Sequence, residues 1–176
     1  SFGDLDLEVG ARYDSTDIIP DDTTKTKRDY NALNAHILTS YNLDNTSKVF
    51  LGFGKASRVP DARELYMGMA TNNNLDQTTN KEVDLGYELN NNSMKFKVKT
   101  FYSDLDNYIY FTGGTTFQNI DAKVYGAELS SEFFATDDLT LDAAASYKKG
   151  KKDNAISAAN TDTDLADIAP LRATIG

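Results

Sequence analysis

Residues 82–102 read EVDLGYELNNNSMKFKVKTFY, which is two runs of alternating side chains on either side of a polar turn. Successive side chains of a β-strand point to opposite faces of a sheet, so a period of two predicts strands with one apolar and one polar face. Asparagine tolerates the backbone of tight turns, so residues 90–92 predict the turn of an antiparallel hairpin. The apolar stripe of this hairpin consists of Val83, Leu85, Tyr87, Leu89, Met94, Phe96, Val98, Thr100 and Tyr102.

The same alternation recurs along the chain. It predicts further strands at 3–13, 31–43, 126–133 and 139–148, a less regular strand at 47–57, and an eighth strand that starts near Ile168. Short turns are expected at 44–46 and 136–138, and longer connections at 17–29, 58–80 and 149–167, with a shorter Gly-Gly connection near 112–116. Short turns at one end and long loops at the other are typical of outer-membrane β-barrels, whereas the loops of a soluble β-sandwich do not alternate by length.

Strand length and tyrosine placement favour a membrane barrel over a soluble sandwich, because alternation alone fits both. A membrane-spanning strand needs about 9–11 residues, and several predicted strands reach that length. Several apolar stripes also end in tyrosine, whose ring suits the headgroup region while its hydroxyl stays in water. These tyrosines are Tyr13, Tyr41, Tyr102 and Tyr147.

Composition excludes several classes of function. The 176 residues carry a formal net charge of -9 and include no cysteine, so disulfides, zinc-thiolate sites and thiol nucleophiles are excluded, and nucleic acid is not an expected partner. No apolar run approaches the roughly 20 residues of a spanning helix. No catalytic triad, phosphate loop or cofactor fingerprint is present, so we predict no enzyme and no cofactor. The mean hydropathy of -0.50 still suits a barrel, in which only alternate residues touch lipid.

Five segments carry a resemblance to a known family. Residues 52–66 read GFGKASRVPDARELY, 74–77 read NLDQ, 81–88 read KEVDLGYE, 101–109 read FYSDLDNYI and 117–129 read FQNIDAKVYGAEL. In this order and spacing they resemble the distal barrel of TonB-dependent receptors, over roughly residues 30–176. Asn73 and Gln77 stand where that family usually has proline, and Thr78 where it usually has glutamate, so this loop is expected to be less rigid here.

The resemblance implies an all-β, antiparallel up-and-down transmembrane β-barrel, of which this chain supplies about eight strands out of about 22. Residues 1–176 are then a single piece of barrel wall without the plug domain, with extracellular loops near 17–29, 58–80, 112–116 and 149–167. Both ends of the sequence fall in patterned segments, as expected for a fragment. The implied location is the bacterial outer membrane, and the implied partners are lipid, lipopolysaccharide, TonB and the plug. The implied function is import of a scarce small ligand, such as a metal, a metal chelate or a vitamin.

Candidate ligand-binding residues lie in the loop after the third predicted strand. The resemblance places Arg58, Arg63, Glu64 and Tyr66 there. Met67 and Met69 follow, and their thioethers either bind copper(I), as the similar copper-transporting members suggest, or shield one another as apolar loop residues. His36, the single histidine, is either a metal ligand or a hydrogen-bonded side chain.

Charged side chains on the polar stripes form a second candidate surface. They would line a wet lumen and contact the plug and substrate, or form cross-strand ion pairs on a solvated face. Gly86 and Gly126 lie on the same stripes, where small residues would let a plug pack closely. The predicted lumen-facing charges are Glu82, Asp84, Glu88, Glu128, Glu132, Lys95, Lys97 and Lys99.

The last long loop offers two weaker candidates. Lys148, Lys149, Lys151 and Lys152 form a basic run that either meets lipopolysaccharide phosphates or is a solvated strand end. Asp162, Asp164 and Asp167 cluster nearby, but they lack the glycine and terminal glutamate of an EF-hand calcium loop.

Two other functions remain open from the sequence. A complete eight-stranded barrel of structural or adhesive type has about this length. A soluble β-sandwich that acts as a binding module has the same alternation.

Overall fold

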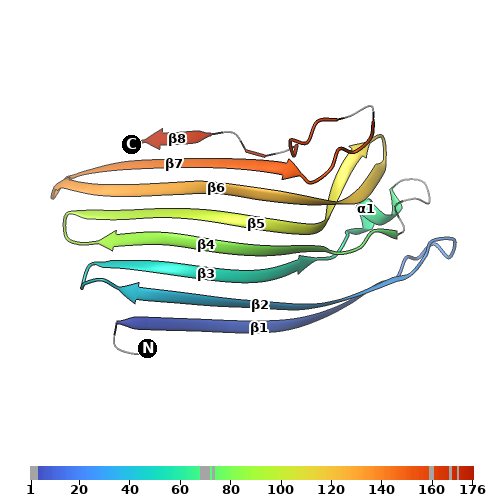
Figure 1. Ribbon diagram of the computed structural model, residues 1–176, viewed down its shortest axis with the longest axis horizontal. Coiled ribbons are helices and arrows are strands. Elements are labelled where there is room, and N and C mark those ends of the chain that lie inside the picture. Colours follow the sequence, from blue (N-terminus) through green and yellow to red (C-terminus); the bar gives the residue numbers. More distant parts are fainter. Residues whose placement is uncertain (1–3, 68–71, 73, 159–160, 167, 170) are drawn as a thin grey trace.

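The computed structural model describes residues 4–67, 72, 74–158, 161–166, 168–169 and 171–176. Within these residues, eight strands and one short helix alternate with turns and loops (Figure 1). No helix among the described residues is long and apolar enough to cross a membrane. The elements are β1 (Leu5–Ile18), β2 (Arg28–Asn42), β3 (Ser47–Arg58), α1 (Ala62–Tyr66), β4 (Thr78–Asn90), β5 (Met94–Gly113), β6 (Thr116–Thr136), β7 (Leu139–Lys152) and β8 (Arg172–Ile175).

All eight strands belong to one antiparallel sheet in the order β1-β2-β3-β4-β5-β6-β7-β8. Figure 1 shows the strands side by side in chain order, with the short turns at one end and α1 and the long connections at the other. The predicted all-β, up-and-down architecture is therefore confirmed. A sandwich would need a second sheet, and a closed eight-stranded barrel would need β1 beside β8, so neither alternative fits this topology.

Most strands extend further towards the loop end than the alternation predicts. The largest difference is β6, which begins ten residues before the predicted start at 126. The reason lies in β5, where the register with β6 shifts between Leu105 and Tyr108 and Asn107 has a φ of 54°. Such a bulge interrupts the period of two without ending the strand. The expected connection at 112–116 is consequently a tight turn, with Gly113 and Gly114 both at positive φ.

The turn between β2 and β3 is closed by one side chain. Asp44 accepts hydrogen bonds from the backbone N–H and hydroxyl of Thr46, each at 2.7 Å, and from the N–H and hydroxyl of Ser47 at 2.9 and 2.8 Å. All four bonds favour the carboxylate over the neutral acid. They lower the pKa of Asp44 to about 2, with the side-chain hydrogen bond from Thr46 as the largest cause.

One face of the sheet is apolar across β1–β7, and we call it the apolar face. Cross-strand partners share a face, and the register pairs Val9 with Ile37, Ile37 with Phe53, and Phe53 with Val83. These side chains pack against no second layer: Leu85 is 57% exposed and Leu141 is 47% exposed. A row of exposed large apolar side chains this extensive marks an interaction surface.

Tyrosines cross the apolar face along a sloping line. The register leads from Tyr147 on β7, through Ala127, Thr100, Leu85, Leu51 and Thr39, to Leu7 on β1. Leu7 lies six residues before Tyr13, which corresponds to about 20 Å along the strand over roughly 29 Å across the sheet. A strand tilt of about 35° from the membrane normal would therefore bring Tyr147 and Tyr13 to the same depth in the membrane. That tilt falls within the range for outer-membrane barrels.

Aromatic rings cover glycines on the opposite face, which we call the polar face. Phe50 lies across from Gly86, Phe101 across from Gly126, and the ring of His36 across from Gly10. A Cβ added at Gly86 would overlap the Phe50 ring and lie 2.8 Å from the carbonyl oxygen of Val98. The space at Gly86 and Gly126 is thus filled by this wall's own rings, so our expectation that it admits a closely packed plug is wrong.

Replacing Gly86 should therefore strain the sheet. We expect Gly86→Ala to lower the free energy of unfolding by about 1–3 kcal/mol, because the added methyl group meets a ring and a backbone oxygen. Urea unfolding of the full-length protein in detergent measures this. Gly54→Ala is the matched control, since nothing lies within 4 Å of a Cβ added there. Equal stability of the two variants would contradict the assignment.

The β2–β3 turn should be sensitive to acid only at very low pH. Because the folded pKa of Asp44 lies below its ordinary value of 3.8, its stabilisation is complete above pH 3.8 and is lost as the pH falls through about 2. Relative to an unstructured peptide at the same pH, hydrogen exchange at the N–H groups of Thr46 and Ser47 should be slowed above pH 4, and Asp44→Ala should abolish this protection. Asp138→Ala, in the β6–β7 turn, should leave both rates unchanged.

Candidate functional site

The polar face carries a network of cross-strand ion pairs. Glu88 on β4 contacts Lys48 on β3 at 2.9 Å and Lys97 on β5 at 2.7 Å. All eight predicted lumen-facing charges lie on this face, because the register places them in the rows between the apolar ones. Three further pairs between β4 and β7 are Lys99 with Asp84 at 3.1 Å, Lys95 with Glu132 at 2.9 Å and Lys148 with Glu128 at 3.0 Å.

These ion pairs neutralise the charges of the polar face but contribute little to the free energy of unfolding. Their side chains are between about a quarter and a half exposed, and exposed pairs contribute about 0–1 kcal/mol each. Lysine ammonium groups also lie over the rings of Phe50, Phe101 and Phe134 at about 5.5 Å. The result is a surface that is wet and highly charged, yet locally neutral.

His36 lies within this face. Its ring rests against Gly10, and its Nε2 is 3.2 Å from a carboxylate oxygen of Glu8. Met67 lies far along the chain, after α1, and no interaction joins the two. Among the described residues, no group of three or more histidine, cysteine, aspartate or glutamate side chains is arranged to hold a metal ion.

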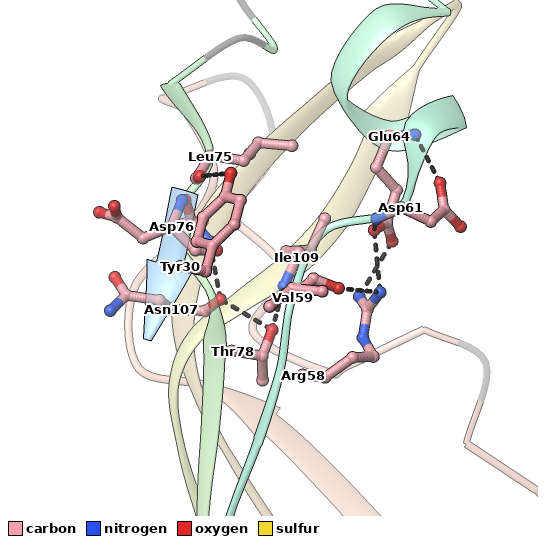
Figure 2. Close-up of polar contacts among 11 residues, drawn as sticks. Tyr30, Arg58, Val59, Asp61, Glu64, Leu75, Asp76, Thr78, Asn107 and Ile109 are labelled. Carbon is pink, nitrogen blue, oxygen red and sulfur yellow. Dashed lines mark hydrogen bonds and ion pairs between the residues drawn. The ribbon is translucent and has the colours of Figure 1, made fainter. Parts of the chain in front are cut away.

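The loop between β3 and β4 is folded around α1. Asp61 accepts a hydrogen bond from the backbone N–H of Glu64 at 2.8 Å, and Glu64 accepts one from the N–H of Asp61 at 2.8 Å, which is a reciprocal capping box. Arg58 at the end of β3 donates two hydrogen bonds to Glu64, at 2.8 and 2.9 Å (Figure 2). Sequence analysis placed Arg58 and Glu64 in one site, and the structure brings them into direct contact.

A small buried core holds this loop against the long β5–β6 hairpin. Leu65 of α1 is fully buried, Leu75 is 2% exposed, and both pack with Ile109 of β5. Ile18, Tyr66 and Phe117 cover the same cluster. We refer to residues 59–67, 72 and 74–77, together with the ends of β1, β2, β5 and β6, as the loop cap.

Hydrogen bonds from β2 and β6 complete the loop cap, and several of its polar contacts are drawn in Figure 2. The hydroxyl of Tyr30 on β2 donates to the carbonyl of Leu75 at 2.9 Å. The amide of Asn119 on β6 donates to the carbonyls of Asp76 at 3.0 Å and Asn107 at 2.7 Å. The sequence did not indicate Tyr30 and Asn119 as residues of this site, because Leu75 and Asp76 lie more than 40 residues away from them along the chain and leave no local pattern.

Two residues that depart from the family pattern also form hydrogen bonds here. Gln77 donates its side-chain amide to the carbonyl of Asn31 at 2.8 Å. Thr78 donates its hydroxyl to the carbonyl of Asn107 at 3.0 Å. Side-chain hydrogen bonds thus anchor the segment in which the usual prolines and glutamate are replaced, while Asn73 lies outside the described residues.

The other predicted loop residues have distinct surroundings. Tyr66 donates its hydroxyl to the carbonyl of Thr26 at 2.9 Å, and burial raises its pKa. Arg63 donates from Nε to the sulfur of Met67 at 3.1 Å, and Met67 is 40% exposed. Met69 lies outside the described residues.

The basic run at the end of β7 divides between the two faces. Lys148 joins the polar-face network, and the buried Lys152 lies 5.1 Å from the ring of Tyr110. Lys149 and Lys151 belong to the rows of the apolar face, and Lys151 pairs with Asp164. Asp164 also donates its backbone N–H to the carboxylate of Asp162 at 2.8 Å, and Asp167 lies outside the described residues.

Several solved structures of transporters and receptors have a similar fold. The copper transporter OprC superposes with a TM-score of 0.82 at 20% identity, over 99% of this chain and 29% of that chain. The FrpB iron transporter from Neisseria meningitidis (F3-3 variant) gives 0.70 at 18% identity, over 86% and 24% of the two chains. The siderophore receptor PirA from Pseudomonas aeruginosa gives 0.62 at 18% identity, over 83% and 34%. At these identities the likeness concerns the fold.

Sequence comparison gives the family. No curated protein sequence matches the chain. The chain spans less than a third of OprC and FrpB, so it corresponds to one part of such a barrel. The sequence model of the family "TonB dependent receptor-like, beta-barrel" matches residues 1–176, and the chain therefore belongs to the β-barrel of the TonB-dependent receptors.

Proposed function

We propose that this chain forms part of the wall of an outer-membrane, TonB-energised receptor that imports a scarce ligand. The observation that carries the proposal is the division of one antiparallel sheet into an apolar and an ion-paired face. An apolar face of this extent suits lipid, and a polar face of paired charges suits a wet interior beside a plug. Family membership and the metal and siderophore transporters among similar folds support the same role.

The ends of the sheet then take opposite sides of the membrane. The short turns would face the periplasm, and the connections near 17–29, 58–80, 112–116 and 149–167 would face the cell exterior. The plug would lie against Glu82, Asp84, Glu88, Glu128, Glu132, Lys95, Lys97 and Lys99, and TonB would supply the energy for import.

The loop cap would carry the ligand contacts. Arg58, Glu64 and Tyr66 are engaged in holding the loop, so we assign them the positioning of its surface. Arg63 of α1 and Met67 at its C-terminal end are in contact and exposed, and we propose that ligand meets this edge together with Met69. Soft thioether ligands suit copper(I). His36 would serve the barrel interior and not this site.

Import should depend on TonB. Cells that express the full-length receptor should accumulate at least one of labelled copper, ferric citrate and cobalamin about tenfold above a receptor deletion strain, because energised release is needed to pass the plug. The excess should vanish in a TonB deletion strain. Uptake that is equal with and without TonB would indicate a passive pore, and a surface-exposed receptor that accumulates none of these probes would contradict import of their classes.

The two methionines should determine copper affinity. In the full-length receptor, Met67→Ala combined with Met69→Ala should weaken copper(I) binding by roughly tenfold or more in isothermal titration, since both soft ligands are removed. Met94→Leu, at the turn end of β5, is the control and should bind as the unchanged protein does. Unchanged affinity in the double variant would end the copper hypothesis while leaving the transport proposal intact.

A further inference from the structure

A guanidinium group and a sulfur atom meet at the exposed end of α1. Arg63 donates a hydrogen bond from Nε to the sulfur of Met67 at 3.1 Å, and both side chains are exposed. The two residues are four positions apart, so the last turn of the helix brings them onto one face. The thioether that we propose as a metal ligand is therefore already occupied by a cationic group of its own helix.

The charge of Arg63 is not neutralised by the carboxylate that follows it in the sequence. Both carboxylate oxygens of Glu64 accept hydrogen bonds from Arg58, and one of them also accepts the backbone N–H of Asp61. Within the described part of the chain, Arg63 has no ion-pair partner. Arginine does not deprotonate in proteins, so its full positive charge stays beside the sulfur at any physiological pH.

The backbone of Met67 is held from two sides. Its N–H donates to the carbonyl of Arg63 at 3.0 Å. The carbonyl of the same peptide bond, which belongs to Tyr66, accepts a hydrogen bond from the ammonium group of Lys25 at 2.9 Å. That ammonium group comes from the β1–β2 loop and also lies 5.4 Å from the centre of the Tyr66 ring. Because this peptide is fixed, the contact with the sulfur is broken by movement of the exposed guanidinium into water.

A guanidinium group and a metal ion compete for the sulfur of a thioether. Both bind its lone pairs, and a thioether is only a weak acceptor. A positive charge about 4 Å from a bound cation also lowers the affinity for that cation about fivefold in water. Soft ions such as copper(I) bind thioethers well enough to displace the guanidinium, whereas hard ions prefer oxygen ligands.

We propose that Arg63 is an internal competitor for the thioether of Met67. It leaves the sulfur when a soft metal ion binds, and it thereby sets the metal affinity and the selectivity of the loop cap. The inference rests on the proposed role of Met67 and Met69 as ligands. It assigns to Arg63 the control of this metal site and no part in the coordination itself.

Isothermal titration of the full-length receptor in detergent with copper(I) tests the competition. Arg63→Ala should tighten copper(I) binding on the order of tenfold, because both the hydrogen bond to the sulfur and the nearby charge are removed. In a Met67→Leu background the same substitution should give no gain, since the sulfur that Arg63 occupies is absent. Lys27→Ala removes an equal charge from an exposed position of the β1–β2 loop and should leave the affinity unchanged.

Zinc(II) is the second probe, because its protein ligands are thiolate, imidazole and carboxylate groups. Its affinity should not rise in Arg63→Ala. Unchanged copper(I) binding in Arg63→Ala would overturn the proposal. An equal gain in the Met67→Leu background or for zinc(II) would also overturn it, because either result reports charge alone. The ligand role of the methionines is tested separately by the double alanine variant, so its failure is distinguishable from a failure of the competition.

Discussion

Hydrogen bonding between neighbouring strands is the interaction on which the rest of this structure depends. In hydrocarbon no water can satisfy backbone N–H and C=O groups, so each strand of a membrane wall must pair with its neighbours. Here the register between β1 and β5 is continuous, and the shifts beyond it lie at the Leu105/Tyr108 bulge and near the turns of the β5–β6 and β6–β7 pairs. A slip of one residue would exchange Leu85 with its polar neighbours and merge the two faces.

Period-two alternation was sufficient to predict the sheet, the turns and the face of every lumen-facing candidate. These features depend only on side chains one or two residues apart, such as Val98 between Lys97 and Lys99. The bulge at 105–108 was not predictable in the same way, since Asn107 adopts its left-handed backbone in a segment that otherwise reads as strand. The partners of Phe50 and Tyr30 also escaped prediction, because register and loop closure bring them together over long sequence distances.

The loop cap explains why the family motif is recognisable although the ligand is not. Arg58 binds Glu64, Asp61 and Glu64 cap α1, and Leu65 fills the small core. Most motif residues are thus occupied in folding the loop, and their pattern reports its architecture. Two side chains at its exposed edge, Arg63 and Met67, contact one another and take no part in the capping box or the small core.

Lysine has opposite surroundings on the two faces, and cross-strand pairing explains the difference. On the polar face four lysines stand opposite a carboxylate: Lys97 and Lys48 face Glu88, Lys99 faces Glu128 and Lys95 faces Glu132. On the apolar face Lys55 faces Lys81. The polar face is therefore largely ion-paired, although Glu132 faces Asp142 there. At the loop-side border of the apolar face the opposed lysines are instead flanked by aspartates, such as Asp106 beside Lys81 and Asp153 beside Lys123.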